Sequence, residues 1–360
     1  MSRYIYHILL ILLTCTLAAC DHKEDTSFVS DNHVIEFSIQ NDFAVNSKSI
    51  IVDTNYQQFG FIALGAWNLE SWEDDTLFGE NGTEVKYTKS GWTYSPGRYW
   101  QKAIYNFAGV MPSSLFAATY NHPSTEYPGS FTASLGGDNH NTLTLNFGDE
   151  GYNLASGQHD LMVAFDNEVD NTDRTMGTEV NGKRKQVSFA FEHLFSVVTI
   201  KAANLESNTN ITIEEIKVYG NSTTAGDMVI TNGAGKISAS YETSGKTTDG
   251  SVYKTLARPA SGSTTDSDWE LSAKSANTSY ETLVSDLIVF PEECTFNISV
   301  TYKDRLGKSY TKSGALSAVW SAGKIYTYTF TVTLDKISFA QPTVEAWPTT
   351  SEKMDDDIEM

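Results

Sequence analysis

The chain has 360 residues, 40% of them hydrophobic and 12% aromatic, and it carries a formal net charge of −20. This length allows two domains, each with its own hydrophobic core, and the acidity disfavours binding to nucleic acid or to anionic membrane surfaces. Three cysteines are too few for a disulfide-rich scaffold or a thiolate metal site.

Residues 1–19 have the features of a signal peptide. Arg3 gives a positive start, and the apolar run at residues 4–13 is too short to cross the roughly 30 Å hydrocarbon core of a bilayer as a helix. Residues 17–20 read LAAC, which resembles the lipobox of bacterial lipoproteins, where the peptide is cut before an acylated cysteine. We therefore expect Cys20 to begin the mature protein and to hold it on a membrane through its acyl chains. The alternative is a conventional signal peptide with an incidental cysteine.

Residues 20–30 are predicted to form a polar tether between the lipid and the fold. Within them, Lys23, Glu24 and Asp25 resemble the export signal of surface-exposed lipoproteins in some Gram-negative anaerobes, a lysine followed by two acidic residues near the lipidated cysteine. Beside Cys20, this motif predicts a location on the cell surface.

Beyond the tether, alternation of apolar and polar residues with period two predicts half-buried β-strands. Residues 142–147 and 326–334 show it most clearly, with threonines on one face and large apolar residues on the other, as in an antiparallel sheet with one wet face. The alternation changes phase within residues 211–218, which predicts a β-bulge. Sustained helical periodicity is absent, and only residues 113–119 favour one or two helical turns. We therefore predict an all-β fold.

The polar stretch at residues 167–185 is the predicted domain boundary. It contains an Asn-Gly pair followed by the basic residues 183–185, a composition typical of a solvated, protease-sensitive loop. This places an N-terminal domain at residues 31–185 and a C-terminal domain at residues 186–347. The acidic tail at residues 348–360 is predicted to be disordered.

Signatures of catalysis and of metal binding are sparse. No two histidines have the HxH or HxxxH spacing of a metal site, and no nucleophile or phosphate-binding motif occurs. His193 follows a strand and is expected to satisfy a hydrogen bond near the domain junction. Asp166, Glu168, Asp170 and Asp173 lie close together, and calcium binding is the alternative for this oxygen-rich cluster, but their spacing departs from that of an EF-hand loop. We predict no enzyme activity, no cofactor and no metal site.

Four tryptophans in the first third of the chain allow two interpretations. Trp67, Trp72, Trp92 and Trp100 could form a platform on which sugar rings stack, or they could be core residues of a β-sandwich. The second interpretation is favoured, because a large sandwich needs aromatic residues in its core.

Several short segments form an ordered set that spans nearly the whole chain. They are the lipobox at Cys20, residues 59–63 (FGFIA), 99–100 (YW), 105–109 (YNFAG), 160–164 (DLMVA), 187–200 (VSFAFEHLFSVVTI) and 320–328 (WSAGKIYTY), and the run from 337 through 344 to 347. With this set the chain resembles the fimbrillin family, the lipoprotein pilins of type V pili in gut and oral Gram-negative anaerobes.

The resemblance implies two transthyretin-like β-sandwich domains in tandem and a structural role in a surface fimbria that supports adhesion. It implies export to the outer membrane as a lipoprotein, removal of the first strand by a surface protease, and filling of the opened groove by a strand from a neighbouring pilin subunit. The physical basis is β-augmentation, in which an unpaired edge is completed in trans. The implied partners are other pilin subunits and a host or bacterial surface ligand, not nucleic acid.

Residues 34–39 are the candidate first strand, with alternate residues facing the core. In the family an arginine shortly after this strand is usually the processing site, but here Lys48 stands in that region and the first arginine of the mature chain is Arg98. Either a protease that accepts lysine acts at Lys48, which describes a stalk subunit, or the protein keeps its lipid and first strand, which describes an anchor at the base of the fibre.

The other end of the chain is the candidate donor strand, with Ile337, Phe339 and Val344 as the pocket-filling residues. A tip subunit is less favoured, because the chain ends soon after its second domain. The alternatives to a stalk or anchor subunit are a tip or accessory adhesin and a monomeric glycan-binding lipoprotein of the cell surface.

Overall fold

The computed structural model describes residues 33–347, except 41–55, 69–71, 74–76, 80, 118–128, 137–139, 150, 155, 220–222, 225–226, 234–235, 242–251, 258–269, 274–278, 292 and 305. The predicted export and processing residues, Cys20, Lys23, Glu24, Asp25 and Lys48, lie outside the described residues. Within the described ranges the helices are two 3-10 turns, η1 (Tyr56–Gln58) and η2 (Ser113–Leu115), and neither could cross a membrane. The predicted all-β class is confirmed.

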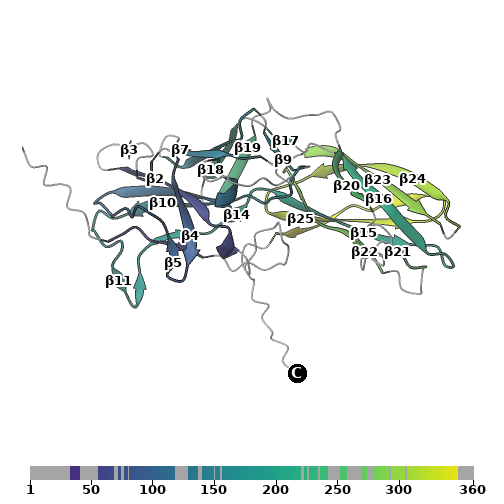
Figure 1. The fold of residues 1–360 in the computed structure, drawn as a ribbon, viewed down its shortest axis with the longest axis horizontal. Coiled ribbons are helices and arrows are strands. Elements are labelled where there is room, and N and C mark those ends of the chain that lie inside the picture. The colour runs from purple at the N-terminus through teal and green to yellow at the C-terminus, as the bar shows by residue number, and fades with distance from the viewer. Residues whose placement is uncertain are drawn as a thin grey trace, which may run out of the picture.

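The N-terminal lobe, on the left of Figure 1, contains a seven-stranded and a four-stranded sheet. The first has the order β14-β10-β6-β2-β4-β5, with β3 on β2, and the second has the order β19-β18-β8-β7. The strands of the larger sheet are β2 (Phe61–Asn68), β3 (Trp72–Glu73), β4 (Thr83–Thr88), β5 (Gly91–Thr93), β6 (Ile104–Met111), β10 (Met162–Asp170) and β14 (Glu192–His193); those of the smaller are β7 (Thr132–Gly136), β8 (Thr142–Asn146), β18 (Asp227–Gly233) and β19 (Lys236–Tyr241).

The C-terminal lobe, on the right of Figure 1, is built from two five-stranded sheets. One has the order β22-β15-β25, with β26 and β27 both on the outer edge of β25, and the other has the order β20-β16-β23-β24, with β21 on β16. The strands of the first sheet are β15 (Ser196–Asn204), β22 (Glu281–Val289), β25 (Lys324–Val332), β26 (Ile337–Phe339) and β27 (Thr343–Ala346); those of the second are β16 (Ile211–Tyr219), β20 (Val252–Ala257), β21 (Glu270–Leu271), β23 (Glu293–Lys303) and β24 (Ser309–Val319).

Period-two patterning correctly located β8, β16 and β25. Tyr326, Tyr328 and Phe330 on β25 are buried and alternate with half-buried threonines. The register of β16 against β23 shifts between Ile213 and Glu215, which confirms the predicted bulge. The threonine face can meet water while the aromatic face packs in the core.

The chain also crosses between the lobes at a place that the sequence did not indicate. The hairpin β18–β19 pairs with β8 of the N-terminal lobe, and β17 (Thr223–Thr224) pairs with β9 (Tyr152–Asn153). Met228 and Ile230 are fully buried there. The domain boundary at residue 185 stays a prediction. The pairing shows in addition that residues 227–241 extend a sheet of the N-terminal lobe.

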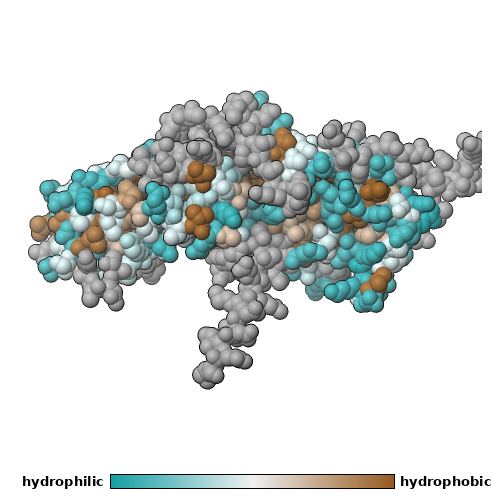
Figure 2. All heavy atoms as spheres, turned by 180° about the vertical axis from the view of Figure 1, so that it is seen from behind, coloured by the Kyte–Doolittle hydropathy of each residue, from teal (hydrophilic) through white to brown (hydrophobic). Residues whose placement is uncertain are grey.

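Exposed apolar side chains are scattered over the surface. Figure 2 shows them as small brown areas separated by hydrophilic residues on the face in view. The most exposed are Leu306, at 83%, and Val319, at 63%, which lie at a hairpin turn and at the end of β24. Isolated apolar residues of this kind are ordinary on a soluble surface.

Gly65 on β2 tests the packing of the N-terminal core. A Cβ atom at this position would lie 2.8 Å from Leu77 Cδ2 and 3.0 Å from Phe78 Cε2. We expect Gly65→Ala to lower the free energy of unfolding by about 1–3 kcal/mol, because overpacking strains a dense core. The matched control is Gly97→Ala, whose Cβ would make only an ordinary contact of 3.6 Å with Val34, so that its stability should stay the same or rise by up to about 1 kcal/mol. Equal effects in chemical denaturation would contradict the packing described for Gly65.

Candidate functional site

The first strand is held by two segments that are distant in sequence. Its N-terminal part is fixed where Ile35 N donates to Arg98 O at 2.8 Å and Trp100 N donates to His33 O at 3.0 Å. Its C-terminal part, β1 (Phe37–Ile39), pairs in parallel with β13 (Val187–Phe189). The strand is therefore a separate piece of β-structure inserted into the N-terminal lobe.

Phe37 is the central side chain of this strand. It is 4% exposed and touches five aromatic rings at centroid distances from 5.6 to 6.3 Å. These rings belong to Phe61, Phe78, Tyr94, Phe107 and Phe189. Because Ile35 is also fully buried and Ile39 is half-buried, the predicted alternation of the strand is confirmed. We call the set of five rings around Phe37 the aromatic slot.

The other face of the strand makes polar contacts. Glu36 pairs with Arg184 at 2.9 Å, and Ser38 Oγ donates to Val187 O at 3.2 Å. Arg184 lies on β12 (Lys183–Arg184), which forms an exposed hairpin with β11 (Glu179–Val180). With side chains 46% and 39% exposed, the ion pair contributes little to stability. Burial of Ile35 and Phe37 thus supplies most of the stabilisation of this strand.

A groove of about 650 Å³ runs between β1 and β5. Trp92 and Tyr94 line one wall, and residues 34–39 line the other. Val187 N donates to Glu36 O and Gln40 N donates to Phe189 O, so Phe37 and Ile39, which alternate with residues 36 and 40, direct their backbone groups away from β13. On that side Ile35 is paired with Arg98 O and with the Tyr94 hydroxyl, whereas Phe37 and Ile39 line the groove.

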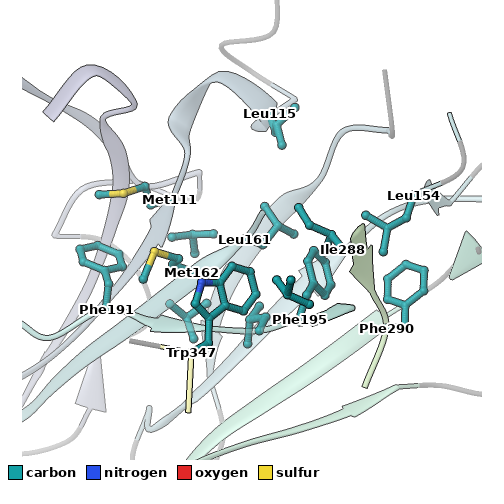
Figure 3. Close-up of a cluster of buried hydrophobic side chains, with 14 of the residues drawn as sticks. Met111, Leu115, Leu154, Leu161, Met162, Phe191, Phe195, Ile288, Phe290 and Trp347 are labelled. Carbon is teal, nitrogen blue, oxygen red and sulfur yellow. The ribbon is translucent and has the colours of Figure 1, made fainter. Parts of the chain in front are cut away.

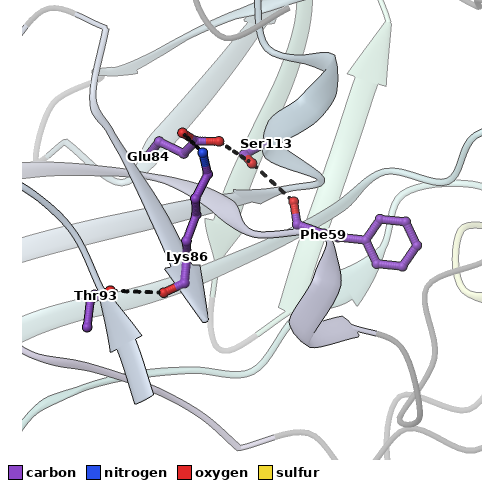
Figure 4. Close-up of polar contacts among 5 residues, drawn as sticks. All are labelled: Phe59, Glu84, Lys86, Thr93 and Ser113. Carbon is purple, nitrogen blue, oxygen red and sulfur yellow. Dashed lines mark hydrogen bonds and ion pairs between the residues drawn. The ribbon is translucent and has the colours of Figure 1, made fainter. Parts of the chain in front are cut away.

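The β4–β5 wall of this groove is tied to the body of the lobe by a polar cluster (Figure 4). Ser113 Oγ lies 2.9 Å from Glu84 Oε1 and 3.0 Å from Phe59 O, and Lys86 Nζ lies 2.7 Å from Glu84 Oε2. Thr93 Oγ1 donates to Lys86 O across the hairpin at 3.4 Å. These contacts link β4 and β5 to the chain that enters β2.

The predicted donor residues lie on the edge of their own lobe. β26 pairs with residues 330–332 and β27 with residues 324–327 of β25, both antiparallel. Phe339 lies 5.6 Å from the ring of Phe330 and covers the backbone of Gly314 on the opposite sheet. Ile337 and Phe339 are half-buried, whereas Val344 is 53% exposed. Their role as donor residues in trans stays a prediction.

Trp347, the residue after β27, is the anchor that sequence reasoning missed. Its side chain is 4% exposed and stacks on the His193 ring at 3.7 Å, with an interplanar angle of 5°. His193 Nδ1 lies 2.7 Å from Asp160 Oδ2, and both side chains are fully buried, which confirms the hydrogen bond expected for His193. Figure 3 shows Trp347 among apolar side chains that include Met162, Phe191 and Phe195. The sequence signal for this anchor was a large apolar residue at the end of the candidate donor segment.

The acidic residues at 166–173 do not gather into a metal site. Asp166 Oδ2 accepts a hydrogen bond from Ser188 N at 2.8 Å, whereas Asp170 and Asp173 accept bonds from Thr172 and Thr175 within their own turns. Among the described residues, no group of three or more histidine, cysteine, aspartate or glutamate side chains could hold a metal ion.

The described tryptophan side chains likewise do not form one platform, and the side chain of Trp72 lies outside the described residues. Trp100 is fully buried, and Trp67 is half-buried and stacked on Tyr105. Of the described tryptophan side chains, Trp92 is the one that lines the groove. Core packing therefore accounts for Trp67 and Trp100, as the favoured interpretation expected.

Comparison with known proteins decides the family. A family model described as fimbrillin-like matches residues 62–347. The chain belongs to the fimbrillin-like family. This membership makes the protein a fimbrial subunit of the cell surface with a part in adhesion, and it implies other fimbrial subunits as partners. The family is structural rather than catalytic.

Solved structures of cell adhesion and fimbrial proteins align with most of the chain. Candidate cell adhesion proteins of Bacteroides uniformis and Bacteroides ovatus share 13% and 12% identity with this fimbrillin-like chain, at TM-scores of 0.42 and 0.44. The alignments cover 88% and 87% of this chain and 98% and 96% of those chains. The fimbrial anchor protein Mfa2 of Porphyromonas gingivalis shares 8% identity at a TM-score of 0.30, with 88% of this chain and 97% of that chain covered. No curated protein matches the chain. At these scores the neighbours add nothing to the family assignment.

Replacement of Phe37 tests the aromatic slot. Phe37→Ala should lower the free energy of unfolding by about 3–5 kcal/mol, because it empties the centre of five packed rings. The control is the adjacent Ser38→Ala, which removes the hydroxyl that bonds to Val187 O and Ser188 Oγ and should cost about 0.5–1.5 kcal/mol. Chemical denaturation of both variants provides the comparison, and equal losses would contradict the central role of Phe37.

The pH dependence of stability tests the environment of Asp166. Burial raises the pKa of Asp166 above its ordinary value of 3.8, although the hydrogen bond from Ser188 opposes this shift. The Asp166 carboxyl therefore contributes fully to the free energy of unfolding below its pKa in the unfolded state. This contribution is lost as the pH rises through its raised pKa in the folded state. Asp166→Asn should gain stability relative to the wild type as the pH rises from about 3.5 to 7.

Asp170→Asn is the control with the opposite sign. Hydrogen bonds from Thr172 lower the pKa of Asp170, so its contribution is present above the unfolded pKa and is lost on acidification. This variant should lose stability relative to the wild type over the same rise in pH. Equal slopes for the two variants in denaturation series would refute the assignment for Asp166.

Proposed function

We propose that this fimbrillin-like protein is a stalk or anchor subunit of a type V pilus, exported as a lipoprotein through Cys20 and assembled by donor-strand exchange. The observation that supports this proposal is the seating of Phe37 in the aromatic slot. A short strand with buried alternate residues, held between segments distant in sequence, can be replaced by another strand with the same pattern.

Removal of residues before Ser49 would uncover the slot. Phe61, Phe107 and Phe189 would lose the ring that now covers them, and an exposed apolar groove of this kind favours association. The C-terminal segment of a second subunit offers Ile337 and Phe339, which alternate as Ile35 and Phe37 do in the first strand. Cleavage would in this way turn a closed monomer into an acceptor.

The state of the N-terminus tests the export and processing steps. Intact mass and N-terminal peptide analysis of protein from the cell surface should give either a start near Ser49 without lipid, as expected for a stalk subunit, or a triacylated Cys20 with the first strand retained, as expected for an anchor. Cys20→Ser should abolish the lipid, and Lys48→Gln should abolish a start at Ser49 while leaving the lipid in place. A mature protein that starts elsewhere and lacks lipid would overturn lipoprotein export.

A peptide competition tests strand exchange directly. A chain that starts at Ser49 should polymerise, whereas the chain that retains residues 33–40 should stay monomeric. A peptide of residues 33–40 should block the polymerisation, and the same peptide with Phe37→Ala should not, because it lacks the ring that fills the slot. Light scattering follows both reactions, and blocking by both peptides alike would contradict the proposed exchange.

A further inference from the structure

The C-terminal segment, residues 337–347, is attached to its own lobe by few side chains. All four residues of β27 are exposed, so their contacts with β25 are mainly backbone pairing. At the start of the segment, Phe339 is half-buried over Gly314. At its end, Trp347 is buried. Between residues 340 and 347, Trp347 is the one buried side chain.

Trp347 also joins the two lobes. Its backbone N donates to Gly323 O, at the start of β25, at a distance of 2.8 Å. Its indole stacks on His193, which lies on β14, an edge strand of the N-terminal sheet. His193 is held in turn by Asp160, which precedes β10. The stack therefore fixes the end of the C-terminal segment to the N-terminal lobe.

We propose that Trp347 is a latch that keeps the C-terminal segment on β25 of its own subunit, and that release of its stack on His193 frees the segment for a second copy of the chain. This inference rests on the proposed donor-strand function. Backbone pairing of an exposed four-residue edge strand opens readily on its own, because little buried surface opposes the opening. Opening of the segment as far as β26 requires Trp347 to leave its buried site, so the latch sets the rate at which donors appear.

Hydrogen exchange of the full-length monomer tests the latch without any need for assembly. Trp347→Ala should speed amide exchange in residues 340–347 by about 100-fold or more. The reason is that the buried indole supplies most of the free energy that opposes local opening of this segment. Trp347→Phe should keep part of the protection, because a phenyl ring can still stack on His193. The control is Val344→Ala in the same strand, which removes an exposed side chain and should leave exchange unchanged. Wild-type protection of β2 and β15 in each variant would show that the fold is intact. Unchanged exchange in residues 340–347 of Trp347→Ala would overturn the latch.

Assembly kinetics separate failure of the latch from failure of the proposed function. Because chains that start at Ser49 should polymerise by themselves, the substitutions are placed in that chain, where Trp347→Ala should polymerise faster than the wild type and Trp347→Phe at a rate between the two. If exchange rises but all variants polymerise at the wild-type rate, Trp347 does not control release and the inference fails. If neither the wild type nor any variant polymerises from a start at Ser49, the donor-strand function fails, whereas the exchange result still decides whether Trp347 holds the segment.

Discussion

The core of the N-terminal lobe depends on one aromatic side chain, Phe37, from a strand that is joined to the lobe by few backbone pairs. Phe37 closes a slot whose rings come from β2, β6 and β13 and from the chain around them, segments that are far apart in sequence. Full burial of a phenylalanine stabilises a fold by about 1.5–3 kcal/mol, and the rings around it would be exposed without it. The lobe therefore requires an extended strand with an apolar residue at this point, but that strand need not belong to the same chain.

The two segments that could exchange are both weakly paired through their backbones. β1 has three register pairs with β13, and β26 and β27 have three and four with β25, whereas β2 and β6 share seven pairs in the middle of their sheet. Because local opening follows the number of contacts that must break, β1 and the segment of β26 and β27 should open more readily than the central strands. Phe37 and Trp347 compensate by giving each weakly paired segment a buried anchor.

Strand positions could be predicted from the sequence far better than strand partners. The threonine alternation on β25 and the phase change on β16 locate strands and a bulge, because period-two burial is a local property of a pleated chain. It does not say which strand lies next to which. The pairing of Asp227 with Asn146 and the stack of Trp347 on His193 join residues too far apart in sequence for any local pattern to reveal. The aromatic slot was likewise visible only as an excess of aromatic residues.

The net charge of −20 restricts how copies of this protein can associate. Like-charged subunits repel one another, but at physiological ionic strength this repulsion is screened beyond about 8 Å. Attraction must therefore act at short range, and the scattered exposed apolar residues in Figure 2 offer no large patch for it on the face in view. An apolar side chain that enters a slot in a neighbouring subunit supplies short-range attraction without a large exposed apolar patch on the monomer. Under the proposed exchange, acidity keeps closed monomers apart, and an emptied aromatic slot becomes the place where hydrophobic burial exceeds the repulsion between subunits.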